Sequence, residues 1–272
     1  MALTITQPLK GLFNIPDEEY FKSEGISKSS LDKINKSPLH YKHNLEHPMV
    51  STPAMKLGSL VHAVILEPSE VEARYAVAPQ VDKRTKAGKA TYAEFLLESE
   101  GKIVVSEDDM DTACAMKDAI IQHQLASTLM CQTGDVEQAI YSIDPDLQVL
   151  KRGKIDKLCH NAKMIIDLKT TADGSPQGFQ SSVFKFNYHT QVAYYMDMCK
   201  EIGVDIERFL FVVVEKTAPY AVSVHELDQE AIELGRQQYK RNLQTLVNCE
   251  MSGEWGSYSD EIIKISAPAW VK

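Results

Sequence analysis

The sequence predicts a mixed α/β fold, in which a central sheet is flanked by helices and preceded by a helical addition. Two observations point to this class. Segments in which apolar residues recur every three or four positions indicate amphipathic helices, and short alternating or β-branched runs between them indicate strands. In chain order the segments are helices, three strands, a helix, two strands and a helix, which is typical of a mixed sheet covered by helices.

The N-terminal part is expected to contain an arm and two short helices. Residues 1–25 have no periodic pattern and are predicted to form an irregular arm, and residues 26–272 a single domain. Helix-start residues at 27–30 and the break at Ser37-Pro38 place two short helices within 27–47, because proline suits the first turn of a helix and disrupts its interior.

The segment 53–68, PAMKLGSLVHAVILEP, is predicted to be a helix that Pro68 ends. Leu57, Val61 and Ile65 fall on one stripe of this helix, and His62 lies beside the stripe. Residues 79–90, PQVDKRTKAGKA, lack apolar periodicity and are expected to form a mobile basic loop. Two helices are expected after this loop, over 90–99 and 106–125.

The C-terminal half is predicted to alternate strands and helices. Gly203 is expected to end one helix, and Asp228 to cap the start of the last one. The predicted elements are a strand at 136–143, a hairpin within 149–170, a Gly/Ser/Pro loop at 172–178, a helix at 187–203, two strands within 208–227 and an amphipathic helix at 228–251.

The hairpin places two acidic side chains where strands usually carry apolar ones. If residues 160–163 form the loop, residue 159 pairs with 164, and the same register sets Asp156 opposite Asp167. Side chains alternate along a strand, so Asp167 and Lys169 share one face, while Ile166 and Leu168 point to the other. A slip of the register by one residue remains open. Opposed acids repel each other unless a cation lies between them, and a divalent metal ion is the obvious candidate.

Composition bounds the class of protein. The chain has 44% hydrophobic and 25% charged residues and a formal net charge of −9, which argues weakly against a non-specific polyanion binder. No apolar run approaches the length of a membrane span, and the N-terminus resembles no secretory signal, so a cytoplasmic protein without membrane contact is expected. Its five cysteines are scattered without metal-ligand spacing and are expected to be reduced.

Two opposed acids followed by a lysine form the minimal set for metal-dependent phosphodiester hydrolysis. Asp156 and Asp167 supply carboxylate oxygens, which Mg²⁺ prefers as ligands, and a bound Mg²⁺ would polarise the phosphate and activate a water molecule. Lys169 lies on the same strand face as Asp167. It is therefore a candidate to orient that water or to offset charge in the transition state. The sequence does not decide between one and two metal ions.

The residues 156–169 resemble the D…DxK pattern of the PD-(D/E)xK nucleases. GSLVH (58–62) resembles the helix-borne histidine motif of recombination nucleases related to lambda exonuclease, and QVAYY (191–195) resembles their Gln-x-x-x-Tyr motif. The layout of the chain, including ISKSSLDKINKSPLHY, the KRTKAGKA loop and the terminal PAW at 268–270, is most similar to the C-terminal nuclease domain of the exonuclease VIII (RecE) type. This resemblance implies a restriction-endonuclease-like core.

The resemblance also implies a role for individual residues. Asp156 and Asp167 would be metal-bridging acids, the backbone carbonyl of Leu168 and the His62 side chain further metal ligands, and Lys169 the catalytic lysine. The resemblance assigns two residues of the following helix, Gln191 and Tyr195, to positioning a DNA phosphate or the lysine. Where the PD-(D/E)xK motif has its proline, this chain has the residues Gly153 to Ile155.

At the level of function, the resemblance implies a Mg²⁺-dependent double-strand DNA 5′-to-3′ exonuclease, with Mn²⁺ as a substitute cofactor. Proteins of this group leave 3′ single strands for an annealing partner of the RecT type and assemble as rings, a homotetramer being the expected state. A phage-type role in DNA recombination and repair follows. A basic channel inside an acidic ring would reconcile DNA binding with the negative net charge.

Several assignments remain open on the sequence alone. Glu137 precedes the hairpin and reaches the site only if its strand is the neighbour in the sheet; otherwise it is a solvated acid. The alternative for Gln191 and Tyr195 is that they are ordinary side chains on the surface of a helix. The cations proposed to contact DNA backbone are Arg152, Lys154, Lys83, Arg84, Lys86 and Lys89, of which the last four lie in the basic loop.

Two alternative functions are kept. One is a related structure-specific endonuclease, or a Cas4-like nuclease for single strands, although the cysteine cluster of the latter is missing. The other is a DNA-binding module of the same fold without catalysis, which the intact acids and lysine disfavour.

Overall fold

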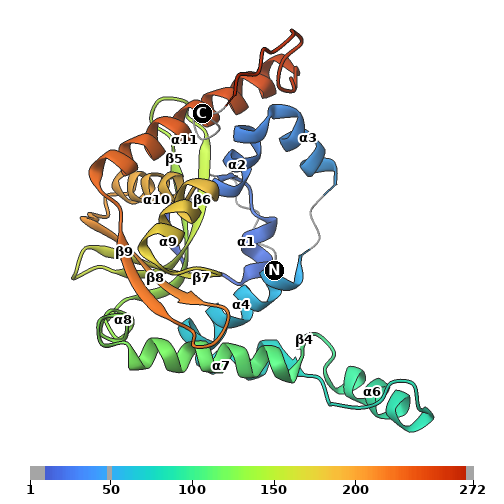
Figure 1. The fold of residues 1–272 in the computed structure, drawn as a ribbon. Coiled ribbons are helices and arrows are strands. Elements are labelled where there is room, and N and C mark those ends of the chain that lie inside the picture. Colours follow the sequence, from blue (N-terminus) through green and yellow to red (C-terminus); the bar gives the residue numbers. More distant parts are fainter. Residues whose placement is uncertain (1–9, 48–50, 268–272) are drawn as a thin grey trace.

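The computed structural model describes residues 10–47 and 51–267, which are arranged around one mixed sheet (Figure 1). Strand order in the seven-stranded sheet is β1-β5-β6-β7-β8-β9, with β2 paired to β6. The strands of this sheet are β1 (Gly11–Phe13), β2 (Ile26–Ser27), β5 (Asp135–Ile143), β6 (Leu150–Cys159), β7 (Met164–Thr171), β8 (Arg208–Glu215) and β9 (Val222–Glu226). A separate parallel pair is formed by β3 (Tyr75–Val77) and β4 (Ile103–Val105).

Helices cover both faces of the sheet, as the sequence predicts. Helices α9, α10 and α11 pack on one face of the sheet, and α4 and α7 pack on the other (Figure 1). The helices are α1 (Asp17–Lys22), α2 (Lys28–Lys36), α3 (Pro38–Glu46), α4 (Pro53–Leu66), α5 (Val71–Arg74), α6 (Lys86–Glu98), α7 (Glu107–Gln122), α8 (Gln124–Met130), α9 (Pro176–Lys185), α10 (Tyr188–Glu201) and α11 (Gln229–Ser252), with a 3₁₀ turn at Pro68–Glu70. The predicted α/β class is therefore confirmed.

The strand β8 shows why the sheet carries a core on each face. Its continuous apolar run FLFVVV is buried, because β8 runs parallel to β7 and is covered on both sides. Phe211 and Val213 pack into a core with α9, α10 and α11, while Val212 and Val214 pack into a second core with α4, α7 and α8. The site described below is formed by the strands β5, β6 and β7 and by one helix from each face of the sheet, α4 and α10.

The expectation of an irregular arm over residues 1–25 is wrong for the described residues 10–25. Strand β1 pairs antiparallel with β5, and α1 packs Tyr20 against Ala139 and Tyr141 of β5. A strand of three residues and a helix of six are too short to show periodicity. They depend on tertiary contacts that local sequence does not reveal. Residues 1–9 lie outside the described part of the chain, as does the PAW segment at 268–270.

The expectation of a loop over residues 79–90 is also wrong in its second half. Helix α6 begins at Lys86, where the Thr85 side chain accepts a hydrogen bond from the N–H of Gly88. The helix projects from the body (Figure 1). Leu96 and Leu97 are exposed, so α6 does not bury an apolar stripe against a core. Such a stripe is the sequence pattern by which a helix is recognised, and its absence hides the start of α6.

Between β7 and β8 the chain forms two helices where one was predicted. Helix α9 starts with Pro176 at its first position and Ser175 as its N-cap, and both residues were assigned to a loop. Helix α10 ends at Glu201, followed by Gly203 with a φ of +82°, and Asp228 caps α11 as predicted. Among residues 10–47 and 51–267, no helix has both the length and the apolar character needed to cross a membrane.

Candidate metal centre and active site

Three acids lie in one row across neighbouring strands. Backbone pairs Val136 with Lys157 and Gln138 with Ile155 flank Glu137, which therefore lies opposite Asp156. On the other side of β6, Cys159 pairs with Met164, so the predicted four-residue loop and its register are correct. By this register Asp167 of β7 is the next acid of the row.

Asp156 and Asp167 lie opposite each other in the register, but their backbones do not pair as part of the β6–β7 ladder. The ladder between β6 and β7 stops at Lys157 and Ile166, one step before the two acids. There the N–H of Leu168 donates a hydrogen bond to Asp156 Oδ2 at 2.7 Å. A side chain thus takes the place of a ladder bond, and the strands separate where the acids need room.

The side chains of His62, Glu137 and Asp156 converge. From helix α4, His62 Nδ1 lies 3.5 Å from Asp156 Oδ2 and 3.8 Å from Glu137 Oε1. The three residues each offer one ligand atom, all within 4.8 Å of one another. Glu137, which the sequence left open, therefore reaches the site, because β5 is the neighbour of β6.

The pKa values in this cluster reflect its crowded charges. Burial by itself lowers the pKa of His62, but the carboxylates of Asp156 and Glu137 outweigh it and raise that pKa to about 9. Burial raises the pKa of Asp156 to about 7, against the lowering effect of His62 and with a further contribution from Asp167. The cluster therefore holds protons that a bound metal ion would displace.

Asp167 is the most deeply buried acid of the row, with 1% of its surface exposed. Its Oδ2 accepts a hydrogen bond of 2.6 Å from Gln191 Nε2, and its Oδ1 lies 2.5 Å from Lys169 Nζ. Burial lowers the pKa of Lys169, but Asp167 and Asp156 outweigh this effect and raise it, so the amine stays charged. The Lys169 ammonium also lies 4.7 Å from the ring centre of Tyr188.

The two residues of the Gln-x-x-x-Tyr pattern are both buried, and they occupy different places. Gln191 donates a hydrogen bond to Asp167, whereas the resemblance implies that it positions a DNA phosphate or the lysine. The Tyr195 hydroxyl accepts from the N–H of Lys154 at 3.4 Å, and its ring lies against β6 at Gly153. A Cβ atom on residue 153 would lie 2.7 Å from Tyr195 Cε1, which explains a glycine inside this strand.

The structure places Arg152 and Lys154, predicted to contact DNA, against helix α1. Arg152 Nη1 donates to the carbonyl oxygens of Tyr20 at 2.6 Å and Ser23 at 2.5 Å. Lys154 Nζ forms ion pairs with Asp17 and, at 2.9 Å, with Glu137 Oε2. These contacts engage both cations within the chain, which disfavours their assignment to DNA phosphate.

The other four predicted DNA-binding cations lie on the projecting segment that carries α6. Lys83, Arg84, Lys86 and Lys89 are all exposed. Helix α6 projects away from the strands β5, β6 and β7 in Figure 1. The Arg84 side chain pairs with Asp82 at 3.1 Å, and Lys83 Nζ lies 3.4 Å from the ring centre of Tyr92. A role for these four residues in binding DNA remains a prediction.

The donor set fits a divalent metal ion. Two carboxylates and an imidazole face one another, and Asp167 Oδ1 is buried beside the Lys169 ammonium without a well-oriented hydrogen bond from any described residue. A buried carboxylate oxygen with spare acceptor capacity calls for an explanation, and a neighbouring metal ion would supply one. His62, Glu137 and Asp156 would hold a metal ion, with Asp167 beside them; the backbone carbonyl of Leu168 remains a predicted ligand.

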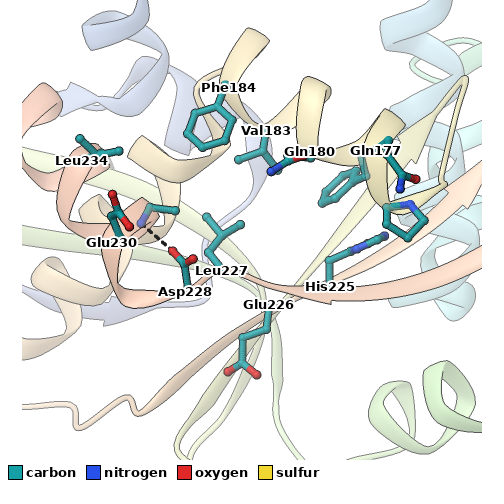
Figure 2. A pocket seen from close by; sticks show the side chains of 13 residues that line it. Gln177, Gln180, Val183, Phe184, His225, Glu226, Leu227, Asp228, Glu230 and Leu234 are labelled. Carbon is teal, nitrogen blue, oxygen red and sulfur yellow. Dashed lines mark hydrogen bonds between the residues drawn. The ribbon is translucent and has the colours of Figure 1, made fainter.

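A hollow of the described chain lies away from these side chains. It has a volume of about 480 Å³ and lies between α9, the end of β9 and the start of α11. Figure 2 shows the side chains that line it. Phe179, Val183 and Leu227 line it, and Glu226 and Glu230 lie at its side. None of the predicted site residues lines this hollow, so its size does not make it the catalytic centre.

A mixed sheet flanked by helices, with acids on adjacent strands and a lysine two residues after the last acid, is typical of the PD-(D/E)xK fold. Residues 27–267 match the model of the family described as PDDEXK-like domain of unknown function (DUF3799). Because this match spans most of the chain, the protein belongs to that family.

One solved structure agrees with this chain in fold. A presumed exonuclease from Eubacterium rectale superposes with a TM-score of 0.63 at 12% identity, covering 94% of this chain and 97% of that one. A phage-related exonuclease from Haemophilus somnus gives a TM-score of 0.35 at 14% identity, covering 86% and 98%, which is too loose to bear on the fold. The comparison with curated proteins gave no match.

Two residues near the site were not singled out from the sequence. Asp17 lies in the arm that was predicted to be irregular, and nothing in its surroundings in sequence distinguishes it. Tyr188 starts helix α10 three positions before Gln191, so a helical projection places the two on one face. That projection was the one signal available for either residue.

Proposed function

We propose that this protein is a Mg²⁺-dependent exonuclease that degrades double-stranded DNA from 5′ ends and leaves 3′ single strands. The observation that carries the proposal is the row Glu137, Asp156 and Asp167 on three adjacent strands, with His62 and Lys169 converging on it. Family membership supports a nuclease-type site. The choice of DNA, polarity and metal rests on the resemblance to the exonuclease VIII type.

The residues of the chain would divide the work as follows. His62, Glu137 and Asp156 would hold the metal ion, which when bound supplies charge to polarise the phosphoryl oxygen and acidify water. Asp167, fixed by Gln191, keeps the Lys169 ammonium next to the acids. The Nζ protons of Lys169 can then donate to the attacking water or to a phosphate oxygen as negative charge develops.

One assay separates the proposed function from its alternatives. Linear duplex, covalently closed circular duplex and single-stranded DNA are each incubated with the protein and Mg²⁺, then with a chelator added. The proposal predicts loss of linear duplex alone, and only without chelator. Cutting of the circle would instead favour an endonuclease, loss of the single strand a Cas4-like activity, and no cleavage a DNA-binding module.

Polarity and site residues are tested on the same linear substrate. With 5′-labelled duplex, label should be released at once, whereas 3′ label should remain on a long single strand. Asp167→Ala and Lys169→Ala should abolish release, while Lys200→Ala, at the exposed far end of α10, serves as the matched lysine control. Full activity of either site variant would refute the assignment.

Two proposals on assembly accompany this function. A homotetrameric ring is expected from the resemblance, and light scattering of the purified protein measures its mass directly. A RecT-type annealing protein is the expected partner, because the 3′ single strands made by the exonuclease are its substrate. Co-purification of such a protein with the wild type tests this second proposal.

A further inference from the structure

The ammonium group of Lys154 connects the metal centre to helix α1. Its Nζ forms ion pairs with Glu137 Oε2 at 2.9 Å and with Asp17 on the other side. The Lys154 side chain is only 18% exposed, so these carboxylates replace most of its water. The two carboxylate oxygens of Glu137 have different partners: Oε1 faces His62 and Oε2 faces Lys154.

Helix α1 is fixed in the position that brings Asp17 to Lys154. Arg152 binds the carbonyl oxygens at the C-terminal end of α1, and the hydroxyls of Ser23 and Tyr141 are 2.7 Å apart. At the other end of the helix, Asp17 Oδ2 accepts from Arg74 at 3.0 Å. Contacts at both ends of α1 therefore hold the Asp17 carboxylate in place.

The charge of Lys154 works against a metal ion unless another charge balances it. A cation beside Glu137 repels a divalent ion and also holds one oxygen of a metal ligand. The carboxylate of Asp17 neutralises this cation and competes with Glu137 for its hydrogen bonds. Both effects should raise the affinity of the site for a metal ion, since each leaves Glu137 freer to bind it.

We propose that Asp17 is a positioning residue of the metal centre, which acts through Lys154 on the charge and the freedom of Glu137. Helix α1 is then a working part of the site, although it precedes the residues 27–267 that match the family model. The inference rests on the proposed metal site.

The test measures Mn²⁺ binding to the full chain by calorimetry, without DNA. Asp17→Asn keeps the shape of the side chain and should weaken Mn²⁺ binding about three- to tenfold, allowing for the partial exposure of this residue. Asp17→Glu, which keeps the charge, should stay close to wild type. Glu19→Gln on the exposed side of the same helix is the matched control and should leave affinity unchanged.

A double-mutant cycle shows whether Asp17 acts through Lys154. In a Lys154→Met background, Asp17→Asn should change the affinity by less than about twofold, because the charge it balances is gone. An equal loss in both backgrounds would overturn the inference, as would an unchanged affinity of the Asp17→Asn protein. If the wild type itself binds no Mn²⁺, or binds it equally well after Asp156→Asn, the proposed metal site fails instead.

Discussion

Replacing Asp156 by asparagine should stabilise the metal-free protein while removing its function. The Asp156 side chain is 14% exposed, and burial raises its pKa from the ordinary 3.8 to about 7. Each unit of pKa difference between the folded and unfolded states corresponds to about 1.4 kcal/mol, so the difference of about 3 units corresponds to roughly 4 kcal/mol. The amide group that the substitution introduces beside His62 offsets part of this gain, which leaves about 2–3 kcal/mol.

The sign of the effect follows from proton binding. The pKa of Asp156 is higher in the folded state than in the unfolded state. Its ionisation therefore costs no stability below pH 3.8, costs progressively more as the pH rises to about 7, and costs a constant amount above that. Urea unfolding in EDTA should show the Asp156→Asn gain in full at about pH 8 and much reduced at about pH 5. The acceptor for the Leu168 N–H is kept, since asparagine retains an oxygen there.

The same variant should respond differently to divalent cations. Wild type should gain stability when Mn²⁺ replaces EDTA at about pH 8, because a ligand of the native state stabilises it, and the variant should gain little. An Asp156→Asn protein that is less stable than wild type in EDTA at that pH would refute the reasoning, since it would show that ionised Asp156 is not a destabilising charge.

Three further predictions concern the surroundings of the acids. Gln191→Leu removes the donor to Asp167 Oδ2 and should cost about 2 kcal/mol in urea unfolding and at least about tenfold in DNA cleavage; an unchanged cleavage rate would contradict the role of Gln191. Gly153→Ala brings a Cβ against Tyr195 and should destabilise by about 1–3 kcal/mol, less so in a Tyr195→Leu background; equal losses in both would disprove the contact. Because the pKa of His62 is raised to about 9, Mn²⁺ binding at neutral pH should release protons and tighten as the pH rises toward 9; calorimetry in buffers of different ionisation enthalpy measures this, and an affinity independent of pH would exclude His62 as a ligand.

The hairpin was predictable because its determinants are local. A loop between two runs of strand-forming residues sets the register, and the register alone brings Asp156 and Asp167 side by side. What the backbone does at that point was not predictable, since the Asp156 side chain replaces a ladder bond. The place of Glu137 required the strand order, which depends on contacts between segments far apart in sequence.

The cations show the limit of reading charge from a sequence. Arg152 and Lys154 lie next to the acids in sequence and on their strand face, which made DNA phosphate a reasonable partner. The structure gives them partners on α1, a helix too short to predict. The acceptor that binds a cation on a strand is set by the tertiary fold. Because that acceptor is distant in sequence, the local sequence around the cation does not predict it.

The most direct test of the metal centre is a crystal of the protein soaked in Mn²⁺ and measured at a wavelength where manganese scatters anomalously. We expect an anomalous peak within ligand distance of His62, Glu137 and Asp156, lost in the Asp156→Asn protein. A peak elsewhere, or no peak among these three side chains, would contradict the assignment of this site.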